Sequence, residues 1–161
     1  MTDYLAPACA ELGDDPDIRA LLARVCALTG MGFAALAYVS ETRWIACQVD
    51  DCVAFGLNPG DELEIKKTIC DEIRTSGERI AIENTDKDPD WWNHPVPVLY
   101  GFRSYVSLPL MINGKFFGTL CAIDDAPREQ SFQLILVELE AMTAELAIMV
   151  ERRLSPDFPA A

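Results

Sequence analysis

Cysteine and histidine are the residue types in this sequence best suited to metal binding or covalent catalysis. The chain holds six cysteines and one histidine: Cys9, Cys26, Cys47, Cys52, Cys70, Cys121 and His94. No C-x-x-C or H-x-x-x-H spacing occurs, so the sequence predicts no metal site, and an iron site built from Asp and Cys side chains is disfavoured. Nothing in the sequence resembles a phosphate-binding loop or a Ser-His-Asp set.

Two tryptophans and one arginine are further candidates for ligand contacts. Trp91 and Trp92 are adjacent in a stretch broken by prolines, so we expect one ring to pack inward and the other to lie at the surface or over a pocket mouth. Arg103 lies among apolar neighbours and suits an anionic or carbonyl-bearing ligand. An ion pair between Arg103 and an acid such as Asp90 or Glu83 is at least as good an interpretation in so acidic a chain.

Composition and charge indicate in which cellular compartment the protein acts and which classes of binding partner it can have. With 161 residues, 50% of them hydrophobic, the chain can build one core without disulfides. Its first residues show no basic segment followed by an apolar one, and no run of 18 apolar residues occurs, so we expect no export signal. We therefore expect a cytoplasmic protein with mostly reduced thiols. The formal charge of -13 repels phosphates and anionic lipids, which excludes nucleic acid and membrane surfaces as partners.

Hydrophobic periodicity predicts an α+β domain around an antiparallel sheet. A capped amphipathic helix ends at Gly30, a second helix is expected over roughly 62–75, and a long helix over 131–154. Strands are expected at 33–40, 43–49, 79–84, 102–112 and 115–124. Asn113 and Gly114 suit the two-residue turn between the last two strands. Residues 85–101 form a long irregular segment, of the kind that often serves as a lid.

The last two strands each have an apolar face and a mixed face. In 115–124 alternation places four residues under the helices: Phe116, Gly118, Leu120 and Ala122. The opposite face of that strand carries Phe117, Thr119, Cys121 and Ile123. The mixed face of 102–112 carries Arg103, Tyr105, Ser107 and Pro109. A mixed face suits the wall of a small-molecule pocket, and it equally suits a partly solvated surface.

The long C-terminal helix has two apolar seams. One seam, at alternating spacings of three and four residues, is Phe132, Ile135, Leu139, Met142, Leu146 and Met149. The second is Leu134, Val137, Ala141, Ala144 and Ile148. Because one seam can cover the sheet, the other needs a partner.

Three segments together resemble the GAF domain, most closely the GAF modules of bacterial sensor histidine kinases and cyclic-dinucleotide signalling proteins. They are "FAALAYVS", "ICDEIRTSGERIAIENTDKDPDWWNHP" and "FRSYVSLPLMINGKFFGTLCAIDDAPRE". The resemblance covers residues 15–153, leaving an N-terminal extension at 1–14 and a tail or linker start at 154–161. The chain would be a stand-alone regulator or the N-terminal module of a longer protein.

The resemblance implies a sheet of five or six antiparallel strands with the terminal helices on one face. A ligand pocket would lie on the other face, under the helix of Cys70 and the irregular lid. The terminal helices would form a homodimer and pass signals to an output domain, such as a histidine kinase or a cyclic-dinucleotide enzyme. The expected ligand is a small organic molecule, contacted by Cys70, Trp91, Trp92, His94, Arg103, Tyr105, Ser107, Thr119 and Cys121.

Three alternatives to this non-catalytic sensor stay open. The free methionine sulfoxide reductases of the same family use pocket cysteines, which would make Cys121 or Cys70 the nucleophile. Asp71 and Glu72 oppose a thiolate at Cys70. Bilin-binding photosensory modules carry a Cys followed closely by His. No Cys lies next to His94, so a bilin is disfavoured. A module with a vestigial pocket would serve for dimerisation alone.

Overall fold

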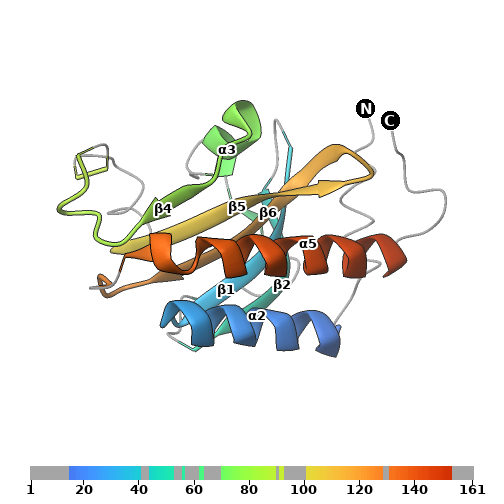
Figure 1. Ribbon diagram of the computed structural model, residues 1–161, viewed down its shortest axis with the longest axis horizontal. Coiled ribbons are helices and arrows are strands. Elements are labelled where there is room, and N and C mark those ends of the chain that lie inside the picture. The colour runs from blue at the N-terminus through green and yellow to red at the C-terminus, as the bar shows by residue number, and fades with distance from the viewer. Residues whose placement is uncertain are drawn as a thin grey trace.

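The computed structural model describes residues 15–40, 44–52, 56, 62–63, 70–89, 91–92, 101–128 and 131–153, without the side chains of 62–63 and 70–72. Six strands form one antiparallel sheet in the order β3-β2-β1-β6-β5-β4 (Figure 1). Their bounds are β1 (Phe33–Val39), β2 (Trp44–Asp51), β3 (Glu62–Leu63), β4 (Ile80–Ile82), β5 (Ser104–Ile112) and β6 (Lys115–Asp124). The described helices are α2 (Pro16–Thr29), α3 (Cys70–Ser76), the 3-10 turn η2 (Phe132–Leu134) and α5 (Leu136–Arg153). The predicted α+β fold is confirmed.

Local signals in the sequence explain where α2 and the β5–β6 turn begin and end. The Asp15 side chain accepts hydrogen bonds from the first turn of α2, and Gly30 ends the helix at φ 74°. Asn113 and Gly114 adopt φ angles of 52° and 77°, as the predicted two-residue turn requires. These positions confirm the first helix and the hairpin.

The sheet separates two helical layers. Helices α2 and α5 lie together on one face, and α3 lies on the other side of the sheet (Figure 1). We call the face under α2 and α5 the helix face and the opposite one the lid face. The larger hydrophobic cluster fills the space between the sheet and the two long helices, and a second cluster lies on the lid face.

The two seams of α5 fall where the spacing predicts. Within the first seam, Phe132, Leu139 and Leu146 are buried against the sheet. In the second, Leu134 is 77% exposed, Val137 78% and Ile148 49%. Helix α5 therefore presents an apolar row to the outside of the domain.

The predicted second helix starts too early. Glu62 and Leu63 belong to strand β3, where they pair with Ile45 and Trp44 at the edge of β2. The edge of β2 offers unpaired backbone groups, and pairing with it takes precedence over local helical periodicity. Residues 64–69, which include Ile65 and Ile69, lie outside the described part of the chain. Helix α3 is described from Cys70, so the helical prediction is confirmed only for its last part.

A β-bulge reverses the predicted faces of Phe116 and Phe117. Leu110 pairs with Gly118 but Met111 pairs with Phe116, so Phe117 is an extra residue in β6. The extra residue shifts the alternation by one. Phe117 lies on the helix face, with its ring 5.6 Å from that of Tyr38, whereas Phe116 packs against the lid-face cluster. The other predicted faces of β6 are correct.

Gly118 is where β6 approaches β1 most closely. A Cβ at this position would lie 1.8 Å from the Ala37 carbonyl oxygen, which is backbone and cannot turn aside. We therefore expect Gly118→Ala to lower the free energy of unfolding in urea by about 3 kcal/mol. Gly114→Asn is the control, because Asn tolerates the left-handed region, and it should cost less than about 1 kcal/mol. Equal effects of the two substitutions would contradict the close approach.

Candidate functional site

The centre of the lid face is made of small side chains. The register places Ala35 and Ser107 on either side of Cys121, and Ala37 between Ala46 and Thr119. Antiparallel partners project to the same face, so these residues form two neighbouring rows of three, one across β1, β6 and β5 and the other across β2, β1 and β6. Val49 in β2 and Pro109 in β5 stand at the fourth positions of these rows. We call this set the floor: Ala35, Ala37, Ala46, Ser107, Thr119 and Cys121. All six are buried.

Large side chains border the floor at both ends of the strands. The row beyond Ala35 holds Phe33, Ile123, Tyr105 and Ile82, which are paired across four strands. The row beyond Ala37 holds Trp44 and Val39, and Phe116 lies at the same end. The floor is thus a shallow area of small groups between aromatic and branched residues.

Helix α3 contributes to the cover of the lid face. It contacts β1, β5 and β6, and its Ile73 is completely buried. The small side chains of the floor take up less volume than the larger residues that could stand at the same positions. The boundary between the floor and its cover is therefore the candidate site for a small molecule.

The structure brings together four of the predicted ligand residues. Ser107, Thr119 and Cys121 belong to the floor, and Tyr105 stands at its border with its ring 5.4 Å from that of Phe102. The side chain of Cys70 and all of His94 lie outside what the structure describes.

The two tryptophans have different environments. Trp91 is half-buried and packs against the lid-face cluster, whereas Trp92 is 65% exposed. One ring packs inward and the other lies at the surface, as the sequence predicts.

The Arg103 side chain forms an ion pair outside the floor. Its guanidinium donates to an Asp86 carboxylate oxygen at 2.6 Å, and both side chains are largely exposed. The expected ion pair with a nearby acid is thus present, with Asp86 as the partner, whereas Asp90 lies outside the described residues. Ser107, the partner of Cys121, is four residues from Arg103, roughly 13 Å along the strand at about 3.3 Å per residue. Arg103 therefore does not lie against Cys121 and does not activate its thiol.

The described cysteines differ in whether they form a disulfide. Cys26, Cys52 and Cys121 are not disulfide-bonded. Cys47 is disulfide-bonded, and its partner is not among the described side chains. Cys47 is thus an exception to the predicted reduced thiols, because spacing in the sequence does not reveal which cysteines a fold brings together.

These three thiols also differ in acidity and in exposure to solvent. Burial, followed by the charge of Asp50 and a hydrogen bond with it, raises the pKa of Cys26 from 9.0 to about 12. Cys52 is exposed, and Cys121 is buried in the floor. Cys26 is therefore a protonated, unreactive thiol at neutral pH.

No group of three or more His, Cys, Asp and Glu side chains within the described ranges is arranged to hold a metal ion. Likewise, none of the helices described is both long and apolar enough to cross a bilayer.

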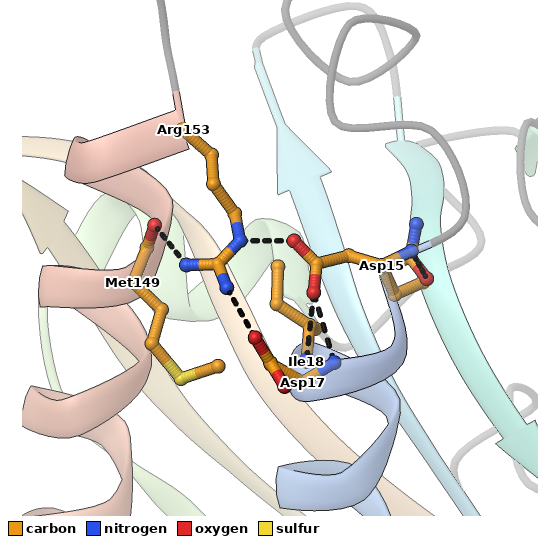
Figure 2. A network of polar contacts seen from close by, with 6 residues as sticks. Asp15, Asp17, Ile18, Met149 and Arg153 are labelled. Atoms are coloured by element: carbon orange, nitrogen blue, oxygen red, sulfur yellow. Dashed lines mark hydrogen bonds and ion pairs between the residues drawn. The ribbon is translucent and has the colours of Figure 1, made fainter.

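An ionic network joins the start of α2 to the end of α5 (Figure 2). The Arg153 guanidinium donates to Asp15, to Asp17 at 2.9 Å and to the Met149 carbonyl at 3.1 Å. The second Asp15 carboxylate oxygen accepts from the Ile18 backbone N–H at 3.2 Å. One carboxylate thus caps α2 and holds the last turn of α5.

The six-stranded antiparallel sheet, with two long helices on one face and a cover on the other, defines the α+β class of this domain. The family model described as GAF domain matches residues 18–154, so the chain belongs to the GAF domain family. None of the curated proteins matches the sequence of this chain.

Solved structures with this fold come from proteins of several kinds. The GAF domain of a two-component sensor histidine kinase from Bacillus halodurans is 16% identical, with a TM-score of 0.63, covering 86% of this chain and 95% of its own. A phycocyanobilin-bound GAF domain from a cyanobacterial phytochrome is 14% identical, with a TM-score of 0.67, covering 84% and 83%. A type II free methionine-R-sulfoxide reductase from Thermoplasma acidophilum is 10% identical, with a TM-score of 0.61, covering 95% and 98%. Identities this low establish the shared fold alone.

Alkylation should distinguish the thiols. In native protein treated with iodoacetamide at pH 8, we expect modification of Cys52 and protection of Cys26 and Cys121, as read by peptide mass spectrometry. The same reaction in urea is the control and should label all three. Because the pKa of Cys26 is about 12, its rate should rise only as the pH approaches that value. Labelling of Cys121 as fast as Cys52 would reveal a reactive floor thiol and favour the reductase alternative.

The network at Arg153 should be energetically coupled. In a double-mutant cycle of Asp15→Asn and Arg153→Met, where Asn preserves the helix cap, we expect a coupling of about 1–2 kcal/mol in urea unfolding. The matched control is Arg24 and Glu145, which also join α2 to α5, at 3.1 Å, but are about half exposed. That pair should couple by less than about 0.5 kcal/mol. Similar coupling in both cycles would mean that Arg153 is an ordinary surface contact.

Proposed function

We propose that this chain is a non-catalytic GAF sensory module that binds a small organic molecule between the floor and its cover. It would act as a cytoplasmic homodimer that relays occupancy through α2 and α5. The output would be a histidine kinase or a cyclic-dinucleotide enzyme joined to it or bound by it. The observation that carries the proposal is the floor, a buried area of small and hydroxyl-bearing side chains in the centre of the sheet.

The floor supports binding because its composition is unusual for the centre of a core. Side chains of Ala, Ser, Thr and Cys occupy positions where Val, Ile, Leu or Phe would pack more completely. Hydroxyl groups at Ser107 and Thr119 offer a few polar contacts on an otherwise apolar surface, as ligand sites commonly do. We assign ligand contacts to Tyr105, Ser107, Thr119 and Cys121, with Trp91 beside them.

The remaining predicted contacts have weaker support. Cys70 and His94 remain predicted contacts on the basis of the family resemblance alone. Arg103 is paired with Asp86, and Trp92 is exposed, so either would reach a ligand only after rearrangement.

The outer row of α5 supports the homodimer. Leu134, Val137 and Ile148 expose apolar surface at helical spacing, with the small Ala141 and Ala144 between them. Ala144 and Ile148 also line a groove of about 950 Å³ between α5 and the β4–β5 edge. A second copy of α5 laid along this row would bury the exposed side chains of both protomers.

The reductase alternative lacks a comparable observation. Cys121 is buried, and the nearest predicted activating cation is paired elsewhere. The Cys47 disulfide opposes the reducing compartment that the proposal assumes.

Native mass spectrometry tests both parts of the proposal. We expect a dimer, with a retained organic molecule when the protein is purified without dialysis. Val137→Glu should yield a monomer, because a carboxylate in the apolar row must be desolvated on pairing. Lys87→Glu, a larger charge change at an exposed position of the β4–β5 connection, is the control and should stay dimeric. A wild-type monomer would contradict the dimer, and an empty protein that takes up nothing from cell extract would contradict the sensor.

A further inference from the structure

The disulfide of Cys47 has two possible partners in this chain. The sequence holds six cysteines, and Cys47 is disulfide-bonded. Three of the others are not: Cys26, Cys52 and Cys121. The partner is therefore Cys9 or Cys70, and the surroundings of Cys47 decide between them.

The Cys47 side chain points to the helix face of the sheet. It is 2% exposed and belongs to the hydrophobic cluster that also contains Ile18 and Leu22 of α2. Ile45 in the same strand pairs with Tyr38, and both belong to this cluster as well. The partner cysteine must thus approach from the side of the sheet that α2 and α5 cover.

Cys70 begins a helix on the opposite side of the sheet. Helix α3 packs against β5, β6 and β1 from the lid face (Figure 1). The Cα atoms of two bonded cysteines are at most about 7 Å apart, and their side chains must point toward each other. Layers stacked face to face are about 10 Å apart, and the Cys47 side chain points away from α3. A bond between Cys70 and Cys47 would have to cross the sheet.

Cys9 precedes the helix that packs beside Cys47. The Asp15 backbone N–H donates to the side-chain oxygen of Gln48 at 3.3 Å, and Gln48 directly follows Cys47 in β2. Cys9 is six residues before Asp15, and six residues of chain span up to roughly 20 Å. Because Asp15 is fixed beside Cys47, this length is ample for Cys9 to reach Cys47 from the helix face.

We propose that Cys47 is bonded to Cys9, and that this disulfide is a redox-sensitive tie between the N-terminal extension and the helix face of β2. The pairing is independent of the proposed ligand. Its use as a switch rests on the proposed cytoplasmic location, because disulfides in cytosolic proteins are usually transient and redox-sensing.

Reduction of the tie needs a dithiol, and reoxidation needs a disulfide. In the first reaction the dithiol closes to its cyclic disulfide, the bond between the two sulfurs of the tie breaks, and Cys9 and Cys47 each gain one hydrogen. In the reverse direction glutathione disulfide takes up both hydrogens and leaves as two molecules of glutathione.

The tie stands next to the network at Arg153 (Figure 2). Gln48, the neighbour of Cys47, accepts from the Asp15 backbone, and the Asp15 carboxylate binds Arg153 at the end of α5. A bond between Cys9 and β2 restricts the chain directly before Asp15. The redox state of the tie therefore acts on the point where α2 and α5 meet.

Peptide mapping tests the pairing. The Cys52→Ser variant, equilibrated with glutathione disulfide, is blocked with N-ethylmaleimide in urea and digested with trypsin without reduction. Trypsin separates the three cysteines in question, with Cys9 in 1–19, Cys47 in 44–66 and Cys70 in 68–74. The substitution removes the second cysteine of 44–66. We expect 1–19 joined to 44–66, and both released by dithiothreitol.

Three results of the mapping would overturn the pairing. The first is peptide 44–66 joined to 68–74. The second is peptide 44–66 with N-ethylmaleimide on Cys47, which would show a free thiol. The third is Cys47 joined to glutathione alone.

Melting temperatures show whether the tie constrains the native fold. Because a disulfide restricts the unfolded chain, dithiothreitol should lower the Tm of the wild-type protein by roughly 5–10 °C. In Cys9→Ser, which lacks the tie, it should change the Tm by less than about 1 °C. Cys70→Ser is the matched control and should respond like the wild type. Loss of the response in Cys70→Ser and its retention in Cys9→Ser would contradict the proposal.

The Arg153 guanidinium reports on the switch. Its Nε–H signal in a ¹⁵N-labelled sample is assigned with Arg153→Met. We expect dithiothreitol to move this signal in the wild-type protein and to leave it in place in Cys9→Ser. A signal that stays in place in both would overturn the switch, whereas the peptide map decides the pairing. None of these measurements uses a ligand, so a failure of the proposed sensor would leave their outcome unchanged.

Discussion

Strand β1 imposes the constraint on which the rest of the domain depends. Each of its seven residues is buried, and the strand lies between β2 and β6 in the middle of the sheet. Its backbone groups can be satisfied only by the two neighbouring ladders, and both of its faces must be covered. The helix face is covered by two long helices with large apolar side chains. The lid face instead has the alanines of β1, and its covering side chains form the second, smaller hydrophobic cluster.

Two bulges surround this central strand. One extra residue at Cys47 in β2 and one at Phe117 in β6 interrupt the pairing near Ala37. Each bulge changes which side chains reach the lid face, and each lies within a few residues of the floor. Bulges are frequent next to functional sites because they redirect side chains without breaking the sheet. The position of Trp44 at the border of the floor follows from the first of them.

Much of this architecture could be predicted from single residues whose preferences are local. Asp15 and Gly30 delimit a helix, Asn113 and Gly114 make a turn, and the spacing of Leu139 and Leu146 identifies the buried seam of α5. Features that depend on pairing between distant segments could not be predicted in this way. The face of Phe117 depends on a bulge, the edge strand at Glu62 depends on an available neighbour, and Arg103 meets Asp86 only because a turn brings them together. The mixed faces of the last two strands indicated Ser107, Thr119 and Cys121, but the alanines of "FAALAYV" gave no comparable signal for the rest of the floor, because alanines are equally common in tightly packed strands.

The junction at Arg153 has a consequence for any longer assembly that contains this domain. Because Asp15 and Arg153 are bound to each other, the first and last residues of the described fold lie side by side. A segment attached after α5 would start beside whatever precedes α2, and the two would share one pivot. A change in the angle between α2 and α5 would therefore change the direction of both attached segments together. The distance between their points of attachment would stay the same.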